Sequence, residues 1–224
     1  MYSVSDRYIA FLRADERLNN VLDNKPTAPK HTRKYLGIVL HRDEHNYFIP
    51  FSSPKKTDYI RSADGLMEIR KSIVPIVRMV TTDTLSGQIE LKGTLRISNM
   101  IPVPDTELTP YDLSAETDAN YKQLVSKELK FIGQNEKQIL KSAAVLYNQK
   151  TQADRLFASG KAPAYLDHVV DFKYAEKKCK EFERLHDLEF VAPARSSVRQ
   201  QLQDIKADMG NNRLTERNIS RNSR

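Results

Sequence analysis

The segment PFSSPKK, from Pro50 to Lys56, places two serine hydroxyls and two lysine ammonium groups directly after an apolar run. Pro54 restricts Ser53 to an extended backbone and itself favours a turn, so the polar tips are expected at the rim of a sheet. Serine hydroxyls can donate to phosphate oxygens, and a lysine supplies positive charge where negative charge grows during phosphoryl transfer. The segment therefore predicts a phosphate site. The alternative is a solvated surface turn, which the same residue types commonly build.

The chain carries no signature of a metal nuclease, a P-loop enzyme or an α/β-hydrolase. It lacks an Asp, Glu and His cluster at metal-ligand spacing, a Gly-rich phosphate loop and a GxSxG motif. A reaction without a metal or another cofactor remains, and RNA suits it because its 2′-OH is a built-in nucleophile. A Ser-Lys hydrolase that uses Ser53 and Lys55 is a further alternative.

The histidines and the single cysteine are not assigned chemistry. His31 falls in a loop, and His41 and His45 flank a turn, where a histidine is commonly an exposed polar residue. Cys179 has no second cysteine for a disulfide and no neighbouring ligands for a zinc site. Its place in an apolar helical stripe predicts a small core residue.

The elements that must position PFSSPKK are predicted as strands. Two apolar runs rich in β-branched and aromatic residues, 35–40 and 47–51, are separated by the polar HRDEHN and predict a hairpin. Proline cannot donate to a ladder, so Pro50 and Pro75 are expected at an edge, a bulge or a strand end. Further strands are expected over 66–70, 73–80 and 94–97.

Helical patterns flank these strands. Ser5 is a predicted N-cap for a helix from about residue 5 to 18, and a loop is expected over 21–33. The stripe after Asn120 predicts a helix that ends at Gly133, and Asn135 is expected to open a second one through about Gln149. A third helix is expected over 171–185. Strands first and helices last predict an α+β domain, in which a twisted antiparallel sheet is packed with helices.

The charge of the chain is concentrated at its C-terminal end. Among 224 residues the formal net charge is +7, and residues 194–224 hold six Arg and one Lys against two Asp and one Glu. We expect a domain over residues 1–190 and a basic extension over 191–224 that is disordered or dependent on a partner, with a marginal helix over 198–208. Because we find no membrane span or signal peptide in the sequence, a cytoplasmic protein is expected.

Several ordered motifs resemble one known family, the ToxN and AbiQ endoribonuclease toxins of type III toxin–antitoxin systems. The resemblance covers residues 2 to about 182. In that family an aliphatic residue usually precedes Thr/Ser-Ser-Pro-Lys-Lys, and here Phe51 and Ser52 replace the commoner Leu and Thr. The motifs are SDRYIAFLR (5–13), the basic pair Arg33 and Lys34 before YLGIVL, YFIPFSSPKK (47–56), LRISNMIPVP (95–104) and YKQLVSKELKFI (121–132).

The resemblance implies a partly barrel-like sheet of the Kid/MazF type with added helices. It also implies cleavage of single-stranded, A-rich RNA without a metal, leaving a 2′,3′-cyclic phosphate and a 5′-OH. By motif position, Ser53 and Lys55 form the central catalytic pair, Ser52 contacts the phosphate or the ribose, and Tyr8 lies near the site. We assign Lys55 the stabilisation of transition-state charge, because an ordinary lysine is protonated at neutral pH, and leave proton transfer open as an additional role.

The resemblance further implies an RNA antitoxin with tandem repeats, which the toxin processes and which bridges protomers into a closed ring. Cellular or phage mRNA is the implied substrate. A non-catalytic RNA-binding module on the same sheet is the alternative function. Basic residues of the loop, the motif and one helix face are expected to contact RNA, and simple solvation is their alternative: Lys30, Arg33, Lys34, Lys56, Lys122 and Lys130.

Overall fold

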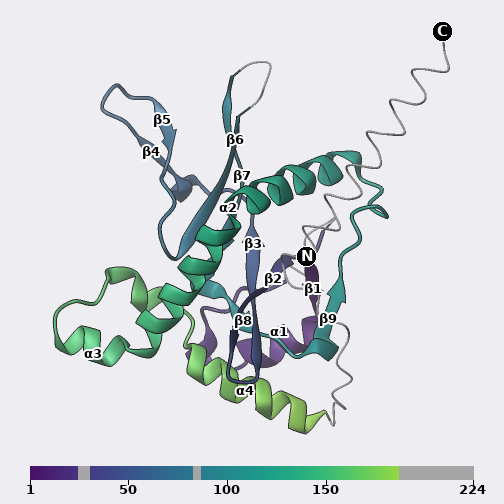
Figure 1. Cartoon of the computed structure of the whole chain (residues 1–224), viewed down its shortest axis with the longest axis vertical. Coiled ribbons are helices and arrows are strands. Elements are labelled where there is room, and N and C mark those ends of the chain that lie inside the picture. The colour runs from purple at the N-terminus through teal and green to yellow at the C-terminus, as the bar shows by residue number, and fades with distance from the viewer. Residues whose placement is uncertain (25–30, 83–86, 187–224) are drawn as a thin grey trace.

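The computed structural model describes residues 1–24, 31–82 and 87–186 (Figure 1). Its centre is an antiparallel sheet in the strand order β6-β7-β3-β2-β1-β9, with β8 also paired to β3 and a separate β4–β5 hairpin. Among the described strands this path does not close on itself. The strands are β1 (Tyr2–Val4), β2 (Lys34–Arg42), β3 (His45–Ser52), β4 (Tyr59–Arg61), β5 (Met67–Ile69), β6 (Ile76–Thr82), β7 (Ile89–Arg96), β8 (Ile101–Pro102) and β9 (Leu108–Pro110).

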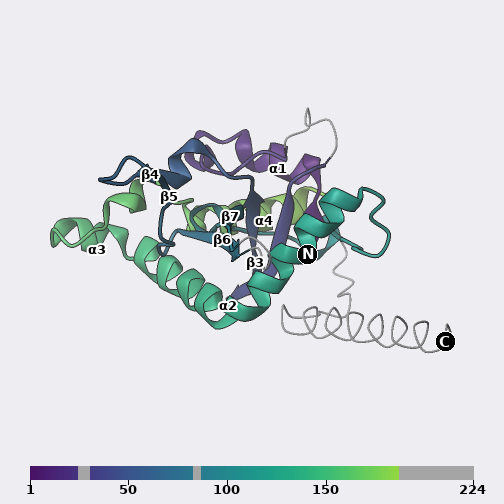
Figure 2. The same cartoon turned by 90° about the horizontal axis from the view of Figure 1, so that it is seen from above.

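Helices cover both faces of this sheet, which confirms a mixed α+β fold. Figure 2 shows α2 on one side of the sheet and α1 on the other. The α-helices are α1 (Asp6–Arg13), α2 (Ala119–Thr151), α3 (Ala153–Ala158) and α4 (Phe172–Leu185). Short 3₁₀ turns link the elements: η1 (Glu16–Leu18), η2 (Lys56–Asp58), η3 (Ile97–Asn99), η4 (Asp105–Glu107) and η5 (Ala164–His168).

The predicted hairpin is confirmed as β2 and β3, and β3 is the central strand of the sheet. All eight residues of β3 are buried. On the side away from β2 it pairs first with β8, through Tyr47 and Phe48, and then with β7, through Phe51 and Ser52. The expectation that Pro50 lies at an edge, a bulge or a strand end is wrong, because Pro50 lies inside this central strand and pairs with Tyr35 of β2. On the other side of β3 it falls between the β8 and β7 pairings, so neither of these includes it. Pro75 directly precedes β6, as expected for a strand end.

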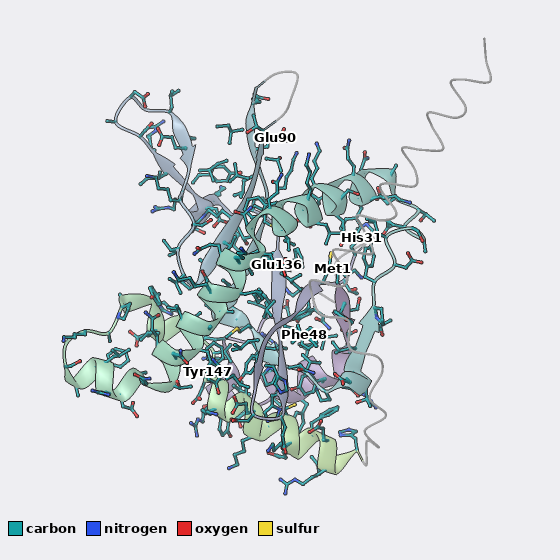
Figure 3. The ribbon with its side chains drawn as sticks, in the orientation of Figure 1. Met1, His31, Phe48, Glu90, Glu136 and Tyr147 are labelled. Carbon is teal, nitrogen blue, oxygen red and sulfur yellow. The ribbon has the colours of Figure 1, made fainter. Side chains whose placement is uncertain are left out.

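A buried carboxylate joins β3 to two helices. Both the Tyr47 hydroxyl on β3 and the Tyr147 hydroxyl on α2 donate to Glu176 Oε1 on α4 at 2.8 Å. The ring of Phe172 contacts both tyrosine rings, with centroid distances of 5.8 and 5.6 Å. Figure 3 places Tyr147 in the C-terminal half of α2, next to α4. The cluster fixes α2 and α4 against the hairpin end of the sheet.

The prediction of two helices separated at Gly133 is wrong, because α2 runs unbroken from Ala119 to Thr151. Asn135 does not cap a new helix, since its side chain donates to the carbonyl of Phe131 four residues earlier, at 2.8 Å. The helix instead bends near its middle, where Figure 3 places Glu136. A glycine inside a helix permits such a bend without ending the helix.

The other helix signals are confirmed with shifted ends. Ser5 caps α1, which ends at Arg13 and is followed by η1. Asp171 caps α4 by accepting from the N–H of Tyr174 at 3.0 Å. Cys179 is 2 % exposed in the core, as expected, and burial raises the pKa of its thiol to about 12.

Some expectations fall outside the described residues. They are the basic extension over 191–224, its marginal helix over 198–208, and Lys30. Within the described ranges no helix is both long and apolar enough to cross a membrane.

Loss of the Glu176 carboxylate should destabilise the fold. Glu176→Ala removes the acceptor of the Tyr147 hydroxyl and leaves the Tyr47 hydroxyl only the Phe172 carbonyl at 3.4 Å, and an unsatisfied buried group costs about 1–3 kcal/mol. We expect urea denaturation to show a free energy of unfolding lowered by at least that amount. The control is Lys177→Ala on the exposed side of the same helix, and equal stability of the two variants would contradict the assignment.

Candidate active site

The segment PFSSPKK lies where β3 leaves the sheet. Ser52, the last residue of β3, is paired with Thr94 of β7 and is 8 % exposed. The following Ser53, Lys55 and Lys56 are exposed. This confirms that the polar tips stand at the rim of the sheet. Ser52 is buried, and its hydroxyl donates to the carbonyl of Ser53 at 3.4 Å. Ser52 therefore stabilises the backbone of the exposed segment that follows it.

Asp58 fixes the backbone that carries Lys55. Its Oδ2 accepts from the N–H of Lys55 at 2.9 Å, and its own N–H donates to the carbonyl of Lys55 at 2.9 Å. This reciprocal pair closes a tight turn over residues 55–58. Asp58 is 1 % exposed, so its charge needs partners inside the protein.

Two arginines from neighbouring strands supply these partners. Arg78 on β6 contacts Asp58 Oδ1 through Nε at 3.1 Å and through Nη2 at 3.0 Å. Arg96 at the end of β7 contacts Oδ2 at 3.4 Å. Arg78 also donates to the carbonyl of Lys71 at 2.7 Å, which ties the chain after β5 to the same point. The turn that presents Lys55 is thus anchored to both strands beyond β3.

A third guanidinium reaches the end of β3 from the other side. Arg33 precedes β2, is 8 % exposed, and donates to the carbonyls of Phe51 and Asp23. Burial lowers the pKa of Arg96, and although Asp58 opposes this, the charges of Arg78 and Arg33 lower it further. Three guanidinium groups therefore lie near the end of β3 against two carboxylates, since Arg78 and Arg96 contact Asp58 and Arg33 lies 3.7 Å from Asp23. The remaining positive charge, together with the exposed Lys55 and Lys56, favours an anion at this end of the strand.

The N-terminal half of α2 and the start of β2 border this region. His31 stacks on Tyr121 with a centroid distance of 3.7 Å, and its Nε2 lies 3.6 Å from Asp118 Oδ2. Lys34 donates to Ser3 Oγ at 2.9 Å and lies over the ring of Tyr111. Figure 3 shows His31 beneath this part of α2.

The predicted basic residues differ in their availability to RNA. The guanidinium of Arg33 donates to two backbone carbonyls, so in this structure it stabilises the end of β3 and is not directed toward solvent. Lys122 donates to the carbonyl of Ser114 at 3.1 Å, whereas Lys56 and Lys130 are exposed. His41 and His45 lie at the other end of β2 and β3.

The prediction that Tyr8 lies near the catalytic serine is wrong. Tyr8 is fully buried on α1, and its hydroxyl donates to the carbonyl of Pro102 at 2.7 Å. Pro102 pairs with Tyr47, six residues before Ser53, which is about 20 Å along an extended strand. The ring packs against Phe182 of α4, so Tyr8 belongs to the core.

Sequence reasoning missed Asp58, Arg78 and Arg96. The spacing of Lys55 and Asp58 was a usable signal, because an acidic residue three positions after a turn start commonly accepts its N–H. The sequence holds no comparable signal for Arg78 and Arg96, because only the pairing of the strands brings them close to Asp58.

Comparison with known proteins identifies the family. The family model of toxin ToxN, from type III toxin–antitoxin systems, matches residues 1–180. This chain belongs to that family. Endoribonuclease AbiQ of Lactococcus lactis subsp. lactis is 32% identical over 178 residues, which are 79% of this chain and 85% of AbiQ. Endoribonuclease ToxN of Pectobacterium atrosepticum is 26% identical, with coverage of 81% and 92%.

Solved structures of the ToxN family share the fold. The structure of AbiQ, an anti-phage endoribonuclease, matches with a TM-score of 0.60 at 26% identity and covers 82% of this chain and 96% of that one. A second solved structure comes from work on selective toxin inhibition by a non-coding RNA pseudoknot, and it also matches with a TM-score of 0.60. It is 23% identical and covers 81% of this chain and 96% of that one. Like its curated relatives, this ToxN-family chain is an endoribonuclease.

Neutralising Asp58 should lower both stability and activity. In Asp58→Asn the two arginines lose their counter-charge and Lys55 loses the charged acceptor of its N–H. We expect RNA cleavage to fall about a hundredfold, because small displacements of a catalytic group have large effects on rate. The measurement is a single-turnover cleavage assay together with urea denaturation. Asp64→Asn, in the exposed β4–β5 turn, is the matched control and should behave as wild type.

Proposed function

We propose that this chain is a toxin that cleaves single-stranded, A-rich RNA without a metal ion and leaves a 2′,3′-cyclic phosphate and a 5′-OH. The observation that carries the proposal is the exposed pair Ser53 and Lys55, held on a fixed turn beside three arginines. RNA supplies its own 2′-OH nucleophile, so the protein has to orient the phosphate and stabilise charge.

The residues of the site have distinct roles in this proposal. The 2′-OH loses its proton to water as its oxygen forms a bond to phosphorus, and the 5′-oxygen takes up a proton as its bond to phosphorus breaks. The Ser53 hydroxyl donates to a non-bridging oxygen, and the Lys55 ammonium stabilises the charge that grows in the transition state. Ser52 positions Ser53, and the exposed Lys56 and Lys130 contact phosphates further along the strand.

We further propose that a repeat RNA antitoxin, which the toxin itself processes, binds at the same exposed end of β3 and bridges protomers into a closed ring. Membership of a type III toxin–antitoxin family supports an RNA inhibitor. A product-like RNA can use the phosphate contacts of the substrate. The proposal includes a cytoplasmic location, a sheet of the Kid/MazF type, an enzymatic domain over 1–190, and an extension over 191–224 that adds RNA affinity.

Removal of the Lys55 ammonium group should abolish strand scission. Purified wild type, freed of bound RNA, is incubated with a long A-rich RNA in excess EDTA, and cut sites and end groups are mapped. We expect wild type to cut and Lys55→Ala to lose at least about a hundredfold in rate. Lys161→Ala, an exposed lysine near α3, is the control.

The outcomes separate the alternatives. Cuts that end in a 2′,3′-cyclic phosphate support the proposed chemistry. Retained RNA binding without cuts by wild type would indicate a non-catalytic RNA-binding module on the same sheet. Labelling of Ser53 by a serine-directed electrophile would indicate a Ser-Lys hydrolase instead.

A further inference from the structure

Glu128 is an acidic residue on the buried face of α2. The residues three and four positions away from it on the helix are Leu124, Val125, Phe131 and Ile132, all of them apolar. The side chain is 8 % exposed, and no hydrogen bond or ion pair joins it to another described residue. An acidic group without a charged partner in such a place is costly to retain, which is typical of a functional residue.

The carboxyl of Glu128 rests on β7 at Gly93. A β-carbon added at Gly93 would overlap Glu128 Oε1, so only glycine allows this close approach. The same β-carbon would lie 3.4 Å from the carbonyl oxygen of Ser52. The absence of a side chain at Gly93 therefore leaves a space on the surface of the sheet, here called the notch, and the Glu128 carboxyl occupies it.

The register of the strands places this notch beside the catalytic serine. Phe51 pairs with Leu95 and Ser52 with Thr94, so the pairing ends one residue before Ser53 and one residue before Gly93 is reached on β7. Because paired α-carbons on antiparallel strands lie about 5 Å apart, Ser53 and Gly93, which each adjoin this last pair, are close in space. Glu128 thus borders the place where Ser53 would hold a phosphate.

We propose that Glu128 is a further catalytic residue, the general acid that protonates the leaving 5′-oxygen. This rests on the proposed RNA cleavage. In the step the 2′-OH loses its proton to water and its oxygen bonds to phosphorus. The bond to the 5′-oxygen breaks, that oxygen takes the proton of Glu128, and the carboxylate is reprotonated by water after release of the product.

The surroundings of Glu128 keep it protonated at neutral pH. Burial raises the pKa of its carboxyl to about 8. Gly93 lies against its carboxyl, and the other groups around that glycine, the Met79 side chain and the Ser52 carbonyl, carry no charge. From its own helix Tyr121 is the titratable group that interacts with it. A general acid is most effective when its pKa lies near the working pH.

The test compares Glu128→Gln with wild type on two RNAs. One is an ordinary RNA, and in the other sulfur replaces the scissile 5′-oxygen, because a thiolate leaves without needing a proton. We expect Glu128→Gln to cleave ordinary RNA about 10²–10⁴-fold more slowly and the sulfur-containing RNA at nearly the wild-type rate. Glu136→Gln, eight residues later on α2, is the matched control.

The pH profile gives a second readout that needs no variant. With ordinary RNA the wild-type rate should fall as pH rises through about 8, since Glu128 then loses its proton, and with the sulfur-containing RNA that fall should be absent. Folding of Glu128→Gln is checked by thermal unfolding at pH 8.5, where the variant should be no less stable because it buries no carboxylate.

The outcomes distinguish this inference from the proposed function. An equal loss of cleavage rate on both RNAs would show that Glu128 has a purely structural role. Unchanged cleavage of ordinary RNA by Glu128→Gln would show that Glu128 has no role in proton transfer. Either result overturns the inference. The same pH dependence for both RNAs also overturns it. If wild type cuts neither RNA, the proposed function itself fails.

Discussion

The buried carboxylate of Asp58 is the point at which the separate parts of the site are joined. It lies in the turn after β3, accepts the N–H of Lys55, and holds arginines from β6 and β7. Breaking a buried ion pair leaves uncompensated charge and costs about 3–5 kcal/mol. The exposed hydroxyl and ammonium groups need this fixed base, because on a free loop their side chains would sample many positions and the entropy of ordering them would oppose the reaction.

Positive charge at the end of β3 is arranged in two layers. Arg33, Arg78 and Arg96 are largely buried and bind the protein itself, whereas Lys55 and Lys56 are exposed. Guanidinium groups suit the inner layer, because their planar donors can satisfy several acceptors at once. The mobile ammonium groups of the outer layer remain available for a phosphate. The charge thus both holds the fold together and attracts the ligand, and different residues perform these two tasks.

Local signals predicted local structure. The hairpin, the cap Ser5, the helix over 171–185, and the rim position of Ser53 and Lys55 all depend on neighbouring residues, and the structure confirms them. The separation of α2 at Gly133 was wrong because packing of both halves on the fold outweighs the weak helix preference of one glycine. Strands of two or three residues, such as β1, β8 and β9, are too short for a periodic pattern. Tyr8 was misplaced because its assignment came from the position of a residue in a motif, which does not say which part of the sheet the side chain meets.

The closure of this fold depends on its last helix, which has a consequence for synthesis on the ribosome. Tyr47 on the central strand finds its hydrogen-bond partner Glu176 129 residues later, and the ring of Tyr8 packs on Phe182. The ribosome synthesises a chain from its N-terminus at about 5–20 residues per second. The core around β3 therefore stays incomplete until α4 has left the exit tunnel, several seconds after the serine and lysine of the site have emerged. A nascent chain thus carries its reactive residues without the finished scaffold, so activity arrives only with the completed protein.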